Sequence, residues 1–157
     1  MGSILCVMAY QQPKSFIDDS IVNISNYWLK QANSKNYHHF FPKAYLKKNN
    51  VDDNKINHII NITIVDDFLN KRKIRDKAPS VYMSGFKEQN PNISGTMKTH
   101  LINLGDFGIW DDNYDLFFNK RAEFISKGIE ERIIKHKIDN KPQPNLEHDY
   151  SDEIEIE

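Results

Sequence analysis

The stretch Tyr37-His38-His39-Phe40-Phe41-Pro42 is the most informative part of this 157-residue chain. Neighbouring side chains on an extended segment point to opposite faces, so one imidazole can bind a metal ion while the other faces a substrate. Pro42 lacks a backbone N–H and restricts the residue before it, so it ends the strand and turns the chain. Residues 37–41 are therefore predicted to form a strand, and residues 42–48 a short helix.

A second β-rich stretch follows at Ile59-Ile60-Asn61-Ile62-Thr63-Ile64-Val65. Its β-branched residues predict a second strand, with a polar loop over residues 51–55 before it. Asp66 then suits the N-cap of a helix that continues through Asn70 to Ile74. Residues 37–75 are thus predicted to form a strand–strand–helix (ββα) unit, which brings the histidine pair beside the helix that carries Asn70.

The four polar residues of this unit have the chemistry that a one-metal phosphodiesterase requires. A nitrogen of His38 and the amide oxygen of Asn70 can bind a divalent cation and leave positions open for phosphate and water. His39, whose ordinary pKa is near neutral, can act as the general base toward the attacking water. Asn61 is expected to form hydrogen bonds across the two strands and to fix their geometry.

The other histidines have weaker claims to a function. His58 is an alternative metal ligand if the second strand begins earlier than predicted. His100, His136 and His148 are interpreted as polar residues of the core or the surface.

The charge of the chain is divided unevenly. Of 22 acidic and 21 basic residues, seven acids and one lysine lie in residues 138–157, which leaves 15 acids and 20 bases in residues 1–137. The segment from Tyr27 to Lys77 holds eleven Lys/Arg and five Asp. A basic surface around a metal site suits a polyanionic substrate, although a solvated lysine-rich face is the simpler alternative. The residues expected to contact nucleic acid are Lys43, Lys71, Arg72, Lys73 and Arg75.

The remainder of the chain is predicted to be mainly helical. Residues 3–10 form a short apolar helix, and residues 113–137 form the best amphipathic helix, with Phe118, Ala122, Ile125, Ile129 and Ile133 on its core face. The breaks Ala78-Pro79-Ser80 and Asn90-Pro91-Asn92 divide the chain between them. The expected organisation is one domain over residues 1–137 (ββα core about 37–75, helical remainder 78–137) and a flexible acidic tail over residues 138–157.

Composition narrows the class of protein further. A hydrophobic content of 39% with 11% aromatic residues is typical of a globular domain. The apolar run Ile4–Ala9 is too short to span a membrane and lacks a basic leader segment, so a cytoplasmic location without membrane contact is expected. The single cysteine, Cys6, excludes an internal disulfide and is expected to be a buried thiol.

The stretch Tyr37–Leu46 resembles the His-[Ile/Phe]-x-Pro-x-x-x-Leu motif of HNH (ββα-metal) nucleases. Ile60–Ile64 and Asn70–Ile74 are similar to the second and third elements of that motif. The string Asp76–Tyr82 matches the Asp-Lys-x-Pro-Ser-x-Tyr string of the C-terminal nuclease region of GmrSD-like restriction proteins, an architecture shared with phosphorothioate-dependent antiphage nucleases. The resemblance covers residues 4–82.

The resemblance implies an α+β fold, a ββα-metal core surrounded by helices, and an endonuclease or nickase that hydrolyses DNA in restriction and antiviral defence. His39 matches the catalytic base, Asn61 the structural asparagine, and His38 and Asn70 the metal ligands. The implied cofactor is Mg²⁺; because relatives often have Asp where this chain has His38, Mn²⁺, Ni²⁺ and Zn²⁺ are also accommodated. Such proteins carry an N-terminal nucleotide-dependent domain that recognises DNA, so this chain is expected to be their isolated nuclease domain.

Two other readings of the sequence remain open. One is a catalytically silent DNA-binding or docking module that keeps the same fold and binds DNA without metal. The other is a helical interaction domain whose acidic tail covers the basic face until a partner arrives. Deletion of residues 138–157 distinguishes the latter, because DNA affinity then rises if the tail shields the basic surface.

Overall fold

The computed structural model describes residues 2–24, 37–65 and 73–130, which contain six α-helices, one 3-10 helix and a two-stranded antiparallel sheet. The elements in chain order are α1 (Gly2–Tyr10), β1 (Tyr37–His39), α3 (Lys43–Lys48), α4 (Asp53–Ile56), the 3-10 helix η1 (Ile59–Asn61), β2 (Ile62–Ile64), α5 (Pro79–Gln89), α6 (Ile93–Thr99) and α7 (Tyr114–Glu130). This mixture of helices with a small antiparallel sheet confirms the predicted α+β class.

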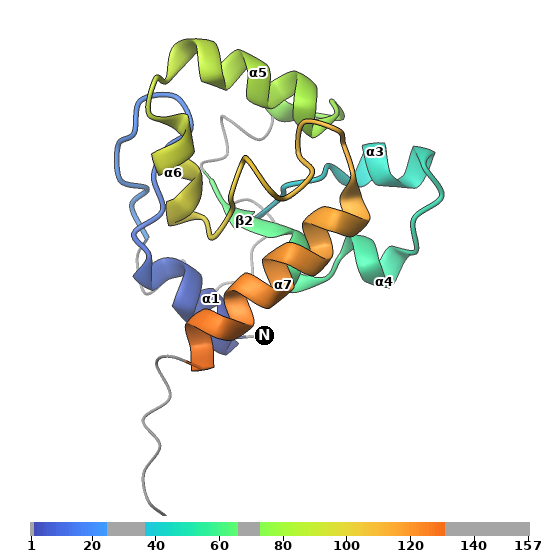
Figure 1. Cartoon of the computed structure of the whole chain (residues 1–157), viewed down its shortest axis with the longest axis horizontal. Coiled ribbons are helices and arrows are strands. Elements are labelled where there is room, and N and C mark those ends of the chain that lie inside the picture. The colour runs from blue at the N-terminus through green and yellow to red at the C-terminus, as the bar shows by residue number, and fades with distance from the viewer. Residues whose placement is uncertain (1, 25–36, 66–72, 131–157) are drawn as a thin grey trace, which may run out of the picture.

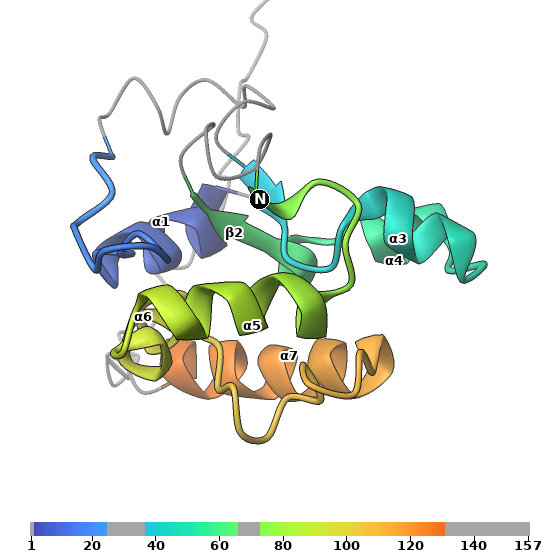
Figure 2. The same cartoon turned by 90° about the horizontal axis from the view of Figure 1, so that it is seen from above.

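The sheet lies near the middle of the fold. β2 has α1 on one side and the α3–α4 pair on the other (Figures 1 and 2), and α7 runs diagonally across it from α4 to α1 (Figure 1). His38 pairs with Thr63 and His39 with Ile62 in the antiparallel register. The backbone N–H of Phe40 extends the pairing by donating to the carbonyl of Asn61 at 2.8 Å.

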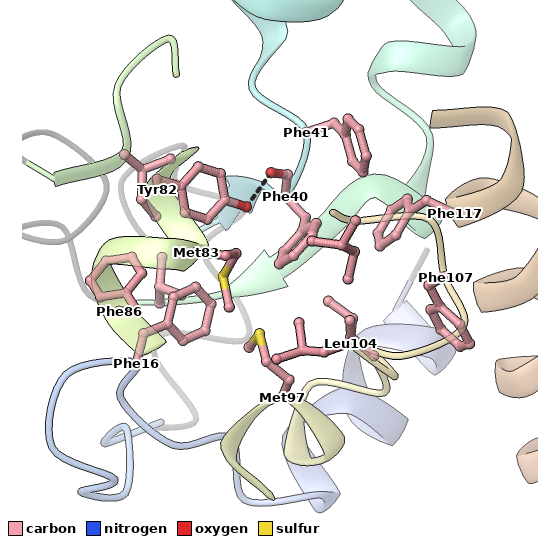
Figure 3. Close-up of a cluster of buried hydrophobic side chains, with 14 of the residues drawn as sticks. Phe16, Phe40, Phe41, Tyr82, Met83, Phe86, Met97, Leu104, Phe107 and Phe117 are labelled. Atoms are coloured by element: carbon pink, nitrogen blue, oxygen red, sulfur yellow. Dashed lines mark hydrogen bonds between the residues drawn. The ribbon is translucent and has the colours of Figure 1, made fainter. Parts of the chain in front are cut away.

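The main hydrophobic core is built on the two phenylalanines that follow β1. Phe40 and Phe41 are fully buried, and the ring of Phe40 stacks on that of Phe117 with centroids 5.1 Å apart. The hydroxyl of Tyr82 on α5 donates to the carbonyl of Phe40 at 2.6 Å (Figure 3). The aromatic residues next to the histidine pair therefore enter the core instead of lengthening the strand, so β1 ends at His39 and not at the predicted residue 41.

The helical predictions are confirmed where they fall on described residues. α1 matches the helix predicted over residues 3–10, and α3 begins after Pro42 and ends at Lys48, with Asn49 as its C-cap. Asn50 follows with a φ of 56°, a conformation that asparagine tolerates better than most residues. Of the two predicted boundaries, the one at residues 78–80 is the start of α5, with Ala78 at its N-cap, and the one at residues 90–92 separates α5 from α6.

α7 confirms the long amphipathic helix over its described length. Phe118, Ala122, Ile125 and Ile129 pack against a second apolar cluster that includes Met8 of α1 and Ile64 of β2. Position 133 and the rest of the predicted helix lie outside the described residues. The helix predicted from Asp66 also lies outside the described residues, apart from its end at residues 73–74, and so does the acidic tail.

Three local predictions were wrong. The polar loop expected over residues 51–55 contains α4, because the side chain of Asp52 accepts hydrogen bonds from the N–H groups of Asn54 and Lys55 and so caps a helix. The strand expected over residues 59–65 is η1 followed by β2, because the His58 side chain caps η1 by accepting from the N–H of Ile60 at 3.3 Å. Cys6 is exposed, because α1 turns the other side of the helix, with Met8, toward the core.

The segment that follows α1 is anchored to α6 by polar contacts. The carboxylate of Asp19 accepts from Lys14 Nζ at 2.8 Å, Thr96 Oγ1 at 2.6 Å and Asn92 Nδ2 at 3.0 Å. The buried His100 donates from Nε2 to the carbonyl of Lys14 at 2.7 Å. Burial lowers the pKa of His100 to about 4, so the ring is neutral in the folded protein at neutral pH.

His100 makes stability depend on pH. Between its ordinary pKa of about 6.5 and the folded value of about 4, the unfolded chain binds a proton that the folded chain excludes. Its contribution to the free energy of unfolding is therefore complete above about pH 6.5 and falls by up to about 3 kcal/mol as the pH decreases to 4. His100→Gln keeps a donor for the Lys14 carbonyl without titrating, so chemical denaturation at both pH values should show a loss in the parent protein about 3 kcal/mol larger than in the variant. Equal losses in the two proteins would contradict this assignment.

Candidate functional site

The histidine pair lies on opposite faces of β1. His38 is buried, with 3% of its surface exposed, whereas His39 is partly exposed. The hydroxyl of Thr63 donates to the carbonyl of His38 at 3.2 Å. His38 and Thr63, which face each other in the strand register, are therefore also joined by a side-chain hydrogen bond. The ring of His38 meets the ring of Tyr82 edge to face, with centroids 6.5 Å apart. One imidazole therefore faces the interior beside α5, and the other faces outward.

His39 is held by a neighbour that the sequence analysis did not select. Its Nε2 lies 3.2 Å from Oδ1 of Asn57, the residue that ends α4. Lys43 Nζ donates to the same oxygen at 3.4 Å. Burial lowers the pKa of His39 below its ordinary value; the bond to Asn57 opposes this effect and the charge of Lys43 adds to it. The ring is thus neutral near pH 7 and is able to accept a proton.

Asn61 ties the strand ends together from the centre of the fold. Its side chain is completely buried; Oδ1 accepts from the N–H of Phe41 at 2.9 Å, and Nδ2 donates to the carbonyls of Phe41 and Ile56 at 3.0 Å each. These are hydrogen bonds across the two segments, of the kind predicted for this residue, although Asn61 lies in η1 and not within the second strand. The amide thereby joins the end of β1 to the helix that carries Asn57.

Three of the five basic residues predicted to contact nucleic acid lie among the described residues. Lys43 is exposed in the first turn of α3, and its ammonium reaches the His39–Asn57 pair. Lys73 and Arg75 are exposed, and Arg75 has a φ of 55°. The ion pair between Lys48 and Asp76 (3.4 Å) places the segment after Arg75 beside the end of α3. Asn70, Lys71 and Arg72 lie outside the described residues.

Two further buried residues support the site, and the sequence analysis gave neither a role. Tyr82, described above, holds the carbonyl of Phe40. Arg121 of α7 is fully buried and donates from Nη1 to the carbonyl of Ile60 and from Nη2 to the carbonyl of His100 at 2.9 Å. Burial lowers the pKa of Arg121 to about 9. An arginine on the core side of an amphipathic helix was the available signal for this role.

Few groups suited to metal binding come together in the described structure. Over residues 2–24, 37–65 and 73–130, no cluster of three or more His, Cys, Asp or Glu side chains is present. The two predicted metal ligands were the imidazole of His38 and the amide of Asn70. Only His38 lies among the described residues. His58, the alternative ligand, uses Nδ1 to cap η1, and its ring packs 5.0 Å from the ring of Phe118.

The cavities with described linings lie away from the predicted residues. The larger hollows border Phe124 of α7, and one of them, about 310 Å³, is formed with α1 and Leu101. Neither hollow is lined by His38, His39, Asn57 or Asn61. At the end of β1, His39 is partly exposed and Asn57 is exposed, whereas His38 and Asn61 are buried.

Comparison of the chain with models of protein families, with curated proteins and with solved structures gives no match. Among the described helices, none has the length and apolar character needed to cross a membrane.

The role of Asn61 in stability is directly measurable. Asn61→Ala leaves one N–H and two carbonyls without their buried partner, at about 1–3 kcal/mol for each group, so the free energy of unfolding should fall by about 3 kcal/mol or more. Asn54→Ala is the matched control, because this asparagine is exposed at the start of α4 and should change stability by less than about 0.5 kcal/mol. Denaturant titration measures both, and a loss below about 1 kcal/mol for Asn61→Ala would contradict the bridging role.

Proposed function

We propose that this chain is a metal-dependent endonuclease or nickase of the HNH (ββα-metal) type that hydrolyses phosphodiester bonds of DNA. The observation that carries the proposal is the hydrogen-bonded frame of Asn61. That frame joins β1 to α4 and holds the neutral imidazole of His39, which is partly exposed, against the exposed Asn57. The motif resemblance of Tyr37–Leu46 supplies the reaction class, and the basic segment around it supplies the reason for a polyanionic substrate.

His39 is the proposed general base. Its ring is neutral at physiological pH and partly exposed, so it can take a proton from a water molecule that attacks the scissile phosphorus. Asn61 does not touch the substrate in this scheme; it keeps the strand end and α4 at a fixed separation. Removal of His39 should therefore abolish turnover without unfolding the protein.

His38 and Asn70 are the proposed metal ligands. An imidazole nitrogen and an amide oxygen form a donor set that accepts Mg²⁺ or Mn²⁺, and the imidazole also suits Ni²⁺ or Zn²⁺. A divalent cation at this position supplies charge stabilisation for the phosphate during hydrolysis. His38 and His39 lie on opposite faces of β1, so in this proposal the metal ligand and the base would be different imidazoles.

The proposed biological setting is restriction or antiviral defence in the cytoplasm. In that setting the nuclease works with an N-terminal nucleotide-dependent domain that selects the DNA. Lys43, Lys71, Arg72, Lys73 and Arg75 are the proposed phosphate contacts.

Plasmid relaxation tests the proposed reaction. Purified protein is incubated with supercoiled plasmid in Mg²⁺, Mn²⁺, Ni²⁺, Zn²⁺ or EDTA, beside His39→Ala and His58→Ala. We expect metal-dependent nicking that His39→Ala reduces at least about 100-fold, since general-base catalysis contributes about 10²–10⁴ in rate. His58→Ala is the comparison, because His58 is the alternative metal ligand and also caps η1. Loss of cleavage together with metal affinity in this variant would identify His58 as a ligand, and loss of cleavage alone would indicate a disturbed η1.

The assignment of roles is tested by metal affinity. His38→Ala and Asn70→Ala should weaken binding of the cation, whereas His39→Ala should leave it largely unchanged. Equal loss in all three variants would mean that His39 is a ligand and that the base lies elsewhere. DNA binding without cleavage in any metal would instead support the silent binding module, a reading consistent with the deep burial of His38.

The basic surface makes a separate prediction for DNA affinity. Lys43→Gln and Lys73→Gln should each weaken binding, and each should reduce the slope of log affinity against log salt by about one, because one phosphate contact is lost. Lys98→Gln removes an exposed lysine of α6, on the far side of the fold from α3 (Figure 1), and should change neither quantity. Equal effects of all three substitutions would indicate attraction by net charge alone.

A further inference from the structure

Asn57 is held at two points before it reaches His39. Its backbone N–H and its side-chain Nδ2 both donate to the carbonyl of Asp53, at 3.0 and 2.8 Å. The preceding residue, Ile56, is fully buried, and its carbonyl accepts from Asn61. The position of the Asn57 side chain is therefore set by α4 and by the frame of Asn61, and not by the contact with His39.

The orientation of the Asn57 amide follows from its neighbours. The Asp53 carbonyl only accepts hydrogen bonds, so the atom beside it must be the amide nitrogen. The ammonium of Lys43 only donates, so the atom 3.4 Å from it must be the amide oxygen. Both neighbours require the same orientation, which directs Oδ1 at Nε2 of His39.

The oxygen at this position determines which ring nitrogen of His39 carries the proton. In a neutral imidazole one nitrogen donates and the other accepts, and an amide oxygen can only accept. Nε2, at 3.2 Å from Oδ1, is therefore the protonated nitrogen, and Nδ1 retains the lone pair.

We propose that Asn57 is the positioning residue of His39: it holds the ring in the Nε2–H tautomer and leaves Nδ1 as the nitrogen that accepts a proton. The hydrogen bond also fixes the rotation of the ring about its bond to Cβ. Lys43 takes part by keeping the Asn57 oxygen turned toward β1. Only the consequence for cleavage rests on the proposed function; the tautomer is a property of the protein itself.

Two substitutions separate this role from the capping of α4. Asn57→Ala removes both the acceptor for His39 and the donor to Asp53. Asn57→Asp keeps an oxygen acceptor for His39 and loses the donor to Asp53. It also adds a negative charge that raises the pKa of His39, so this variant is compared at a pH high enough for its ring to be neutral. A positioning role predicts rescue by Asn57→Asp, whereas a purely structural role predicts that both variants fail equally. Asn54→Ala is the control, because it lies on the same helix and its side chain is exposed.

Ring-nitrogen NMR of ¹⁵N-labelled protein, without added metal and at a pH where His39 is neutral, reads the tautomer. We expect the Nε2–H form in the parent protein, in Asn57→Asp and in Asn54→Ala, and averaged tautomers in Asn57→Ala. An Nδ1–H ring in the parent protein, or an unchanged tautomer in Asn57→Ala, would overturn the inference. This readout is independent of any cleavage.

Plasmid cleavage provides the second readout. Asn57→Ala should lower kcat by about 10- to 100-fold with little change in KM for DNA, and Asn57→Asp should recover much of the loss. The expected NMR result together with no cleavage by the parent protein would overturn the proposed function and leave the tautomer assignment supported. Tautomer averaging in Asn57→Ala with an undiminished kcat would overturn the positioning role in catalysis.

Discussion

The buried amide of Asn61 is the contact on which the arrangement of this protein depends. Its three hydrogen bonds join Phe41, which lies just after β1, to Ile56, the last residue of α4. A two-stranded sheet of three residues per strand is marginal by itself. The amide supplies donors and an acceptor to backbone groups that burial has removed from water, where an unpaired group is costly.

A second buried polar residue holds the same turn from the other side. Arg121 reaches from α7 to the carbonyl of Ile60, the residue before Asn61, and also to the carbonyl of His100. Its burial lowers its pKa, yet the group remains a cation at neutral pH because about 9 is still well above 7. The 3-10 helix η1 is thus held by the side chain of Asn61, one of its own residues, and by Arg121 of α7. These bonds explain why residues 59–61 form a 3-10 helix although their β-branched neighbours favour a strand.

The residues of the candidate site are held by this frame. His39 is partly exposed at the end of β1, and its partner Asn57 is carried by a helix of four residues whose last residue is fully buried. A short helix with a fixed C-terminus presents its side chain more accurately than a free loop would. The insertion between the two strands thus brings the amide oxygen of Asn57 to 3.2 Å from Nε2 of His39.

Much of the local structure was predictable, since its causes are local. Proline and asparagine set the ends of α3, α5 and α6, the apolar spacing set the core face of α7, and the alternation of a strand put His38 and His39 on opposite faces. The hydrogen bonds expected of Asn61 were also anticipated from the same stretch. For the helix ends, the core face of α7 and the alternation of β1, the signal lies within a few residues of the feature. For Asn61, whose partner Phe41 is 20 residues away, the expectation came from the predicted pairing of the two strands.

Tertiary structure alone decided the remaining features, because each depends on which distant surfaces meet. His39 and Asn57 are 18 residues apart, and Arg121 and Ile60 are 61 residues apart, so no periodic pattern pairs them. Phe40 and Phe41 carry strong strand propensity but gain more by burial against Phe117 and Tyr82 than by lengthening β1. The exposure of Cys6 has the same kind of cause. Packing against β2 and α7 determines which side of α1 is buried, and a helix that is apolar on all sides does not specify that side by its own sequence.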